Sequence, residues 1–444
     1  MTRRYFGTDG IRGTVGEKPM TAEFALRLAS AAARVLAPNG GRAVIGKDTR
    51  VSGYMFESAL EAGFVAAGMD VSLLGPLPTP GIAHMTHSLN ADLGVVISAS
   101  HNPFEDNGIK FFDRKGRKLS DELELQIEAF LEQPAITRPS EELGSASRVD
   151  TARSQYQWFA LSTVPKEMRL DGVKIVLDCS HGAAYKVAPR VLSQLGADLV
   201  AIGCSPNGIN INKGCGSTQP GLLQATVKGV GADLGIALDG DGDRLLMVDS
   251  DGNLLDGDHL LYLLAMHRKA SGTLKGPVVG TLMSNLGLEV SLKAKGVEFY
   301  RANVGDRYVL EMLRDKGGEL GGETSGHLLV LDKTTTGDGL VSALQVLSIV
   351  AETGKSLQQL VADMPQYPQT MINVRTPSKV DLEAPAIRAG VTKLEAQLGD
   401  RGRVVLRASG TEPVVRVMVE GQDHDEVVAL ADELADVVRA VAAG

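Results

Sequence analysis

Three aspartates alternate with glycines in the stretch DGDGDR, residues 239–244, directly after an apolar run. Carboxylates at this spacing repel one another, which raises their pKa values unless a cation lies among them. Oxygen ligands of this kind select Mg²⁺, Ca²⁺ or Mn²⁺. A calcium EF-hand is excluded, because Arg244 stands where that loop needs glycine and Ser250 where it needs glutamate. We predict that Asp239, Asp241 and Asp243 bind one Mg²⁺ per chain; a solvated acidic turn is the alternative.

A second stretch, VVISASHNP at residues 95–103, is a β-forming run that ends in polar residues. It is not the G-x-S-x-G elbow of a serine hydrolase, and His101 is too close along the chain to Ser100 to serve as a triad base. A serine that meets a magnesium site instead suggests a phosphoserine, because the metal binds the phosphate and stabilises the leaving alkoxide. We predict Ser100 as this residue, since Ser98 still belongs to the strand. A polar cap on a strand is the alternative.

Two further loops carry groups that suit a phosphorylated sugar. The stretch GGETSGH, residues 321–327, offers Glu323, Ser325 and His327 on a glycine-rich turn. The stretch RASGTEP, residues 407–413, is followed by Arg416, and two arginines with hydroxyls and glycine amides form a plausible phosphate clamp. For the first loop the alternative is an ordinary turn. For the second the alternative is two arginines on a solvated strand face.

Two cations lie near the chain's other polar motifs. Lys110 is flanked by apolar residues in NGIKFF, and partial desolvation there would suit proton transfer. A snorkelling surface lysine is the alternative. Arg12 lies in the glycine-rich stretch FGTDGIRG, which could line an anionic site or form a turn.

Strand and helix patterns alternate along the chain and predict α/β units with doubly covered sheets. The predicted strands and helices are strands at 42–47, 71–74, 93–97, 173–179, 198–203, 277–283, 297–300, 370–376, 403–409 and 414–420, and helices at 52–68, 121–132, 183–195, 382–398 and 425–442. The segment 134–149 is predicted to be a surface connection. The motif ADLG opens strands at residues 91 and 232, and a weaker copy, GELG, lies at 318–321, which indicates three related units. In such sheets ligands gather beyond the carboxyl ends of strands.

Composition excludes several partner classes. The chain has 444 residues and a formal net charge of −9, which argues against nucleic acid or an anionic membrane surface as a partner. No run of about 18 apolar residues is present, and the N-terminus has no apolar leader, so we expect a cytoplasmic protein. Cys179, Cys204 and Cys215 show no metal-ligand spacing. We expect the single tryptophan, Trp158, to pack in a core or between domains.

The motifs FGTDGIRG, SASHNP, DGDGDR, GGETSGH and RASGTEP occur in this order. As a set they resemble the α-D-phosphohexomutase superfamily, and the pattern is most similar to its bacterial phosphoglucosamine mutases. The resemblance runs from Tyr5 to the C-terminal helix. It implies three related, doubly covered mixed-sheet α/β domains and a smaller α+β domain of TATA-binding-protein-like fold around a central cleft. The expected domains are 1–155 with the phosphoserine, 156–255 with the metal loop, 256–366 with the sugar loop and 367–444 with the phosphate loop.

The resemblance also implies roles for individual residues. It implies that Ser100 is the phosphoserine and a metal ligand, together with the three aspartates of the metal loop. The cleft residues that it implicates in proton transfer or charge stabilisation are Arg12, His101, Lys110 and His327. The residues that it implies for substrate binding are Arg244, Glu323, Ser325, Arg407, Ser409, Gly410, Thr411 and Arg416.

The activity implied is an isomerase that interconverts glucosamine 6-phosphate and glucosamine 1-phosphate, feeding UDP-N-acetylglucosamine synthesis. Phospho-Ser100 would give its phosphoryl group to the sugar, and the glucosamine 1,6-bisphosphate formed would return the other phosphate; that compound or glucose 1,6-bisphosphate would serve as activator. A phosphomannomutase/phosphoglucomutase is the alternative within the superfamily. A non-catalytic sugar-phosphate sensor and a hydrolytic metallophosphatase are alternatives of other classes. The expected partner is a small phosphosugar, and a homodimer is an expectation from the resemblance alone.

Overall fold

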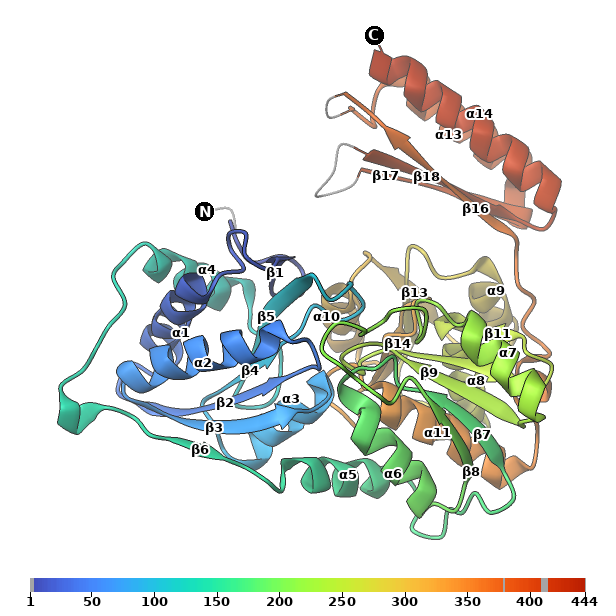
Figure 1. The fold of residues 1–444 in the computed structure, drawn as a ribbon. Helices are drawn as coiled ribbons and strands as arrows, with labels where there is room; N and C mark the ends of the chain where they lie inside the picture. The colour runs from blue at the N-terminus through green and yellow to red at the C-terminus, as the bar shows by residue number, and fades with distance from the viewer. Residues whose placement is uncertain (1–3, 378–379, 409–413, 444) are drawn as a thin grey trace.

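The computed structural model describes residues 4–377, 380–408 and 414–443. Four sheets follow one another along the chain, and the last one stands apart from the others at the top of Figure 1. One sheet falls in each of the four predicted segments. Helix α5 (Ala152–Ser162), however, runs across the predicted boundary between residues 155 and 156. We therefore propose that the first boundary lies before Ala152; the other boundaries stay a prediction.

The first sheet has the strand order β1-β5-β4-β2-β3-β6. Its central strands β3, β2 and β4 are parallel, whereas β5 runs antiparallel to β4. Both faces are covered: Ala43 and Ile45 pack with Phe56 and Phe64 on one side, and Val44 joins the core on the other. The elements are β1 (Ile11–Thr14), α1 (Ala22–Leu36), β2 (Gly41–Lys47), α2 (Ser52–Ala66), β3 (Met69–Pro76), α3 (Thr79–Ser88), β4 (Leu93–Ile97), β5 (Asp106–Asp113), α4 (Asp121–Leu131), η1 (Ser140–Glu142) and β6 (Ala146–Arg148).

The second and third sheets repeat this plan. Their orders are β11-β10-β9-β7-β8 and β13-β12-β14-β15. The second contains β7 (Lys174–Asp178), η2 (Ala183–Lys186), α6 (Val187–Gln194), β8 (Asp198–Ile202), α7 (Gly221–Val230), β9 (Leu234–Leu238), β10 (Leu245–Asp249) and β11 (Leu254–Leu255). The third contains α8 (Gly257–Ala270), β12 (Val278–Thr281), α9 (Leu286–Ala294), β13 (Phe299–Ala302), α10 (Asp306–Lys316), β14 (Leu320–Gly322), β15 (Leu328–Val330), α11 (Gly339–Thr353) and α12 (Leu357–Val361).

The predicted internal repeat is visible in this topology. The motif copies lead into β4, β9 and β14, and each of these strands is followed by a polar loop and then by an antiparallel strand. The three loops therefore leave equivalent strands of three similar sheets. The mixed-sheet α/β class predicted from the sequence is confirmed.

The fourth sheet is smaller and antiparallel, in the order β16-β18-β17. Two long helices cover one of its faces (Figure 1). Its elements are β16 (Gln369–Arg375), α13 (Pro385–Leu398), η3 (Gly399–Arg401), β17 (Gly402–Ala408), β18 (Val414–Gly421) and α14 (His424–Ala443). It has an apolar core of its own, whereas one continuous core runs through the first three units, including Val44, Leu177 and Leu344. The fourth domain is therefore the part most able to move independently.

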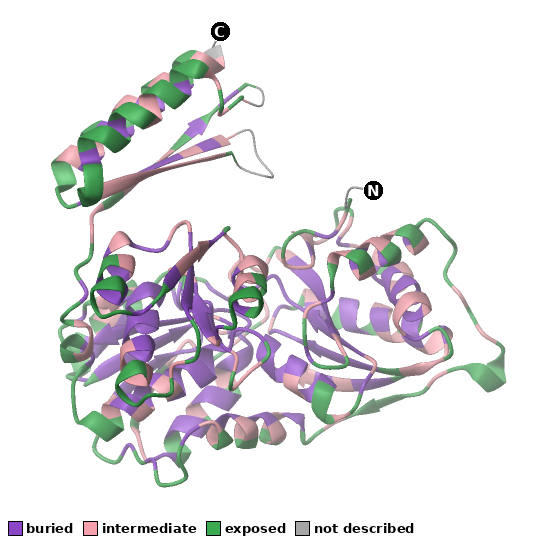
Figure 2. Cartoon of the chain, turned by 180° about the vertical axis from the view of Figure 1, so that it is seen from behind, coloured by how far each residue is buried: buried purple, intermediate pink, exposed green. Residues whose placement is uncertain are grey.

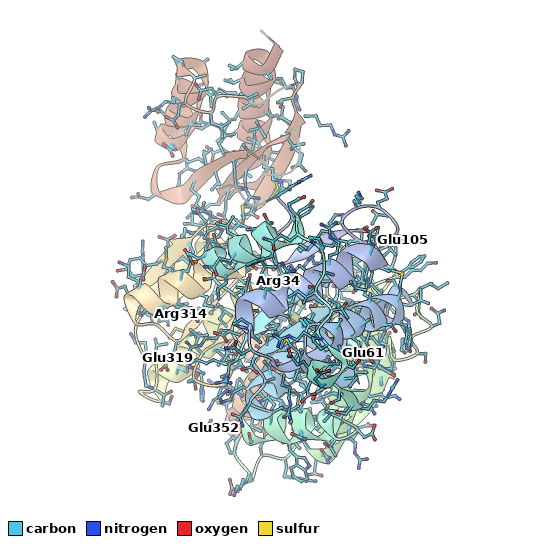
Figure 3. All side chains as sticks on the ribbon, turned by 90° about the vertical axis from the view of Figure 1, so that its left-hand side faces the viewer. Arg34, Glu61, Glu105, Arg314, Glu319 and Glu352 are labelled. Atoms are coloured by element: carbon cyan, nitrogen blue, oxygen red, sulfur yellow. The ribbon has the colours of Figure 1, made fainter. Side chains whose placement is uncertain are left out.

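The sheets and the outer helix faces differ in how far their residues are buried. The central strands of the first three sheets, such as β4, β9 and β12, are buried in Figure 2, while edge strand β6 and the outer helix faces are exposed. Charged side chains such as Glu105, Arg314 and Glu352 lie on the outer surface (Figure 3). No helix among the described residues is both long enough and apolar enough to cross a membrane.

Two local expectations were wrong, and a third was incomplete. Trp158 is 69% exposed, because it lies on the outward face of α5. The connection at 134–149 is largely exposed, as expected, but it also contributes the edge strand β6, parallel to β3. Strand β13 begins at Phe299 instead of at Val297, because the Val297 amide donates to the Leu292 carbonyl and so closes helix α9.

Candidate active site

Ser100 follows β4 in a left-handed backbone conformation, with φ of +52°. This conformation costs a non-glycine residue about 1–2 kcal/mol, so the surroundings must hold it. The Ser98 hydroxyl accepts from the Ser100 amide at 2.9 Å. The Ser100 carbonyl accepts from Asn212 Nδ2 at 2.9 Å and from an Arg50 guanidinium nitrogen at 3.2 Å. Groups from two sheets therefore fix the serine at the carboxyl end of its strand.

The three aspartates after β9 meet this serine. Ser100 Oγ donates to Asp239 Oδ2 at 2.6 Å. The three carboxylates can each offer an oxygen, and these oxygens lie within 4.8 Å of one another. Burial, together with Asp243 and Asp241, raises the pKa of Asp239 well above its usual value. Asp241 Oδ1 and Asp243 Oδ1 are buried without a hydrogen-bond partner. Repelling, unsatisfied carboxylate oxygens fit a divalent cation.

Lys110 of β5 lies beneath the acidic cluster. Its Nζ is 2.9 Å from Asp241 Oδ2 and 2.8 Å from Asp9 Oδ2. Burial lowers the pKa of Lys110, but Asp241 and Asp9 outweigh burial, and the pKa lies above its usual value. Of the two alternatives that the sequence offered, the structure favours the desolvated lysine over the snorkelling one, because Lys110 is buried. A part for Lys110 in proton transfer stays a prediction. Lys110 is held as a cation that balances two carboxylates.

A chain of charges continues across the cleft from Asp9. Lys118 Nζ lies 2.6 Å from Asp9 Oδ1 and 2.5 Å from Asp306 Oδ2. His327 follows: its Nε2 is 3.4 Å from Asp306 Oδ2 and its Nδ1 is 3.5 Å from Asp243 Oδ2. Burial lowers the pKa of His327, but Asp243 and Asp306 raise it more, to about 9. Asp9, Lys118 and Asp306 were missed in the sequence, although Asp9 lies inside the FGTDGIRG motif.

His101 and Arg12 complete the surroundings of the serine. His101 Nδ1 is 3.4 Å from Ser100 Oγ, so the ring lies beside the serine although the two residues are neighbours in the chain. The left-handed turn at Ser100 brings the next side chain back beside it. Burial, Arg244 and Arg12 lower the pKa of His101 to about 4. Arg12 pairs with Asp9 and donates to the Ala99 carbonyl at 3.3 Å.

A cavity of about 610 Å³ lies between the four domains. The predicted site residues that line it are Arg12, Ser100, His101, Asp243, Arg244, Glu323, His327, Arg407 and Arg416. Lys110, Asp239 and Asp241 are buried and are not part of its lining, whereas Ser325 is exposed and also lies outside the lining. Ser409, Gly410 and Thr411 lie outside the described residues.

Two arginines face this cavity from the fourth sheet. Arg407 of β17 is directly opposite Arg416 of β18 in the antiparallel register. Burial and the neighbouring Arg416 lower the pKa of Arg407. Like charges placed opposite one another in a sheet are destabilising, so the arrangement favours an anionic ligand between them.

On the opposite wall, Glu323 is held by the Gly305 amide, which donates to Oε1 at 3.0 Å. Burial raises the pKa of this carboxyl. The cavity, the three aspartates, Ser100 and the arginine pair could together hold a phosphorylated molecule with polar groups between its ends.

Four family models match the chain in order. They describe the α/β/α domains I, II and III and the C-terminal domain of phosphoglucomutase/phosphomannomutase, over residues 3–136, 156–252, 256–367 and 371–437. The chain belongs to the phosphoglucomutase/phosphomannomutase family. The superfamily inferred from the five motifs is thereby confirmed.

Full-length similarity extends to other members of the family. Phosphoglucosamine mutase 1 of Shewanella amazonensis is 56% identical over 440 residues, which cover 99% of both chains. A solved phosphoglucomutase/phosphomannomutase family protein from Burkholderia thailandensis has a TM-score of 0.80 at 25% identity, covering 98% of this chain and 97% of that one.

A third similarity shows the fold alone. Aspergillus fumigatus N-acetylphosphoglucosamine mutase, solved in complex with GlcNAc-6P and magnesium, has a TM-score of 0.69 at 18% identity, with 99% of this chain and 96% of that one covered.

Proposed function

We propose that this family member is a phosphoglucosamine mutase, an isomerase that interconverts glucosamine 6-phosphate and glucosamine 1-phosphate. The observation that carries the proposal is Ser100 Oγ, held 2.6 Å from Asp239 on one wall of a cavity whose opposite wall carries the arginine pair. The choice of glucosamine rests on the full-length relatives at 54–57% identity, which are phosphoglucosamine mutases. These relatives do not favour the phosphomannomutase/phosphoglucomutase alternative.

The metal loop would hold Mg²⁺ through Asp239, Asp241 and Asp243, with the phosphate of phospho-Ser100 as a further ligand. We choose Mg²⁺ because three carboxylates leave positions for phosphate or water oxygens. When bound, Mg²⁺ would neutralise charge on the transferring phosphoryl group and on the serine oxygen. The chain's own part is to bury the three carboxylates and to aim Ser100 at them.

The first half-reaction moves the phosphoryl group from Ser100 to the sugar. The bond between phosphorus and Ser100 Oγ breaks, and a bond between phosphorus and O1 of glucosamine 6-phosphate forms. The hydroxyl proton leaves O1 and ends on Ser100 Oγ. We assign the delivery of this proton to Ser100 Oγ to His101, whose Nδ1 lies 3.4 Å from that oxygen. Arg12, Lys110 and His327 hold charge around the phosphoryl group.

The second half-reaction needs the bisphosphate to turn over within the cavity. Its 6-phosphate then returns to Ser100 and glucosamine 1-phosphate leaves. Arg407 and Arg416, with Ser409, Gly410 and Thr411, would bind whichever phosphate is not reacting. Arg244 and Glu323, which line the cavity, would bind the sugar in both orientations. Ser325 lies outside the lining, and its part in sugar binding stays a prediction. A glucosamine 1,6-bisphosphate or glucose 1,6-bisphosphate activator would reload enzyme that has lost its phosphoryl group.

The test is mutase turnover with Mg²⁺ and a catalytic amount of bisphosphate, on the 6-phosphates of glucosamine, glucose and mannose. We expect a clear preference for the glucosamine ester, and equal or better turnover of the others would reject the substrate assignment. Ser100→Ala should lose turnover while keeping its fold, because the transferred group has no acceptor. Release of inorganic phosphate without isomerisation would instead indicate a metallophosphatase.

A further inference from the structure

The loop at residues 321–327, called the sugar loop, makes two hydrogen bonds to the start of helix α8. The Gly257 amide donates to the Thr324 carbonyl at 3.0 Å, and the Thr324 hydroxyl donates to Asp258 Oδ2 at 2.8 Å. Thr324 follows Glu323 directly, so any shift of the loop at the cavity moves this contact. Asp258 is fully buried in the first turn of α8. Its carboxylate is not part of the reacting site.

The same oxygen of Asp258 also holds the segment 282–286. The Asn285 amide donates to Asp258 Oδ2 at 2.8 Å. Asn285 in turn binds the connection to the fourth domain: its Nδ2 donates to the Tyr367 carbonyl at 2.9 Å, and the Tyr367 amide donates to its Oδ1 at 3.1 Å. One carboxylate oxygen therefore joins the sugar loop to the connection between the third and fourth domains.

The fourth domain grips the same segment from its other side. The Leu286 amide donates to Glu420 Oε1 at 2.8 Å. Arg403 donates to the carbonyls of Leu282 at 2.8 Å and Ser284 at 2.6 Å, and its Nε donates to Glu420 Oε2 at 2.6 Å. These contacts fix the base of the sheet that carries the arginine pair.

Space for movement lies beside this network. A cavity of about 440 Å³ is bordered by Asp258, Asn285, Thr324, Tyr367 and Gln369. Where no hydrogen bond crosses it, this cavity separates the sugar loop from the connection to the fourth domain. The network supplies the short hydrogen bonds across this joint, beside two longer ones of 3.4 Å that the Thr324 hydroxyl and Gln369 Nε2 donate to the Met283 carbonyl.

We propose that Asp258 is a positioning residue that couples occupancy of the sugar loop to closure of the fourth domain. The proposal rests on the proposed function, because it assigns the sugar to Glu323 and a phosphate to the arginine pair. When the sugar settles the loop, Thr324 and Asp258 fix segment 282–286, and Glu420 and Arg403 then hold the fourth sheet over the cavity. Without Asp258 the two events become independent, and the closed form is populated less.

The test compares Asp258→Ala with Asp258→Asn. Both hydrogen bonds go to one oxygen, so asparagine can still accept them and alanine cannot. Because apparent affinity falls with the fraction of closed protein, we expect alanine to raise KM for glucosamine 6-phosphate about tenfold with little change in kcat. Asparagine should restore KM. Asp249→Ala, which removes a buried carboxylate that accepts from the Asp251 and Asn253 amides, should change thermal stability without changing KM.

Closure itself is measured by small-angle X-ray scattering with and without glucosamine 6-phosphate. We expect the sugar phosphate to contract the wild type but not Asp258→Ala at the same concentration. If Asp258→Ala does not fold, Asn285→Ala cuts the same path and should show the same rise in KM. A wild-type KM and contraction in folded alanine variants would overturn the coupling. Absence of turnover in the wild type would instead reject the proposed function.

Discussion

Lys118, between β5 and α4, forms an ion pair with Asp306 at the start of α10, with Nζ 2.5 Å from Oδ2. The pair joins the first and third units across the cleft. Lys118 also balances Asp9, which lies beside Arg12 and Lys110. A single ammonium group therefore keeps the carboxylates of Asp9 and Asp306 from competing for the cations around Ser100.

Replacing Lys118 with methionine should lower both stability and activity. Removing one partner of a fully buried ion pair costs about 3–5 kcal/mol. The loss should be smaller here, because the Lys118 and Asp306 side chains are 14% and 13% exposed. The freed carboxylates would also draw Arg12 and His327 away from the phosphoryl group, so kcat/KM should fall. Thermal melting and steady-state kinetics measure the two effects. Exposed Lys115→Met is the matched control, and equal behaviour of the two variants would contradict the role.

Mg²⁺ should raise the melting temperature of the wild type. An ion that binds only the folded chain stabilises it by about 2.7 kcal/mol at one hundred times its dissociation constant. Asp241→Asn should abolish most of this rise and weaken the Mg²⁺ dependence of turnover. Asp249→Asn, in the β10–β11 turn, should keep both. An unchanged Mg²⁺ titration in Asp241→Asn would reject the metal loop.

Arg416→Ala should raise KM for glucosamine 6-phosphate about 10- to 100-fold, the equivalent of losing a hydrogen bond between charged groups. The reason is that Arg416 and Arg407 face each other across β17 and β18 toward the cavity. Exposed Arg375→Ala on β16 is the control for a lost charge on the same sheet. A KM that stays at the wild-type value would show that the phosphate binds elsewhere.

His84 should make stability depend on pH below neutrality. Its ring stacks on Phe159 at 4.0 Å, and burial and His87 lower its pKa to about 4 from 6.5. Between these values the unfolded chain binds the proton and the folded chain does not, so stability falls as pH drops from about 6.5 to about 4. His84→Phe should flatten this part of the urea-unfolding profile relative to the exposed control His424→Gln. If the free energy of unfolding changed equally with pH in both variants, His84 would not be the group responsible.

The sequence predicted the repeated units because each ADLG copy is a local signal of a buried strand followed by a polar loop. The metal loop was also predicted from a local signal, because three carboxylates at alternate positions can be recognised without any knowledge of the tertiary structure. Each motif that faces the cavity was therefore found from its own local sequence, without reference to the other domains.

The sequence did not reveal contacts between residues that lie far apart in the chain. Lys118 lies in a basic turn that resembles any solvated surface turn, and only the packing of α10 against the first unit makes it a cleft residue. The direction of the pKa shift of Lys110 depends on Asp241, far along the chain, and not on its apolar neighbours. Asp258 and Glu420 act through contacts between domains, which no periodicity records.

The arrangement of the site also constrains how the protein is made. Ser100 follows a strand of the first sheet and Arg416 lies in the last sheet, so a ribosome makes Ser100 and the three aspartates long before the arginine pair. A nascent chain therefore cannot line the whole cavity until its final strands have emerged. The complete cavity is the last feature that the growing polypeptide acquires.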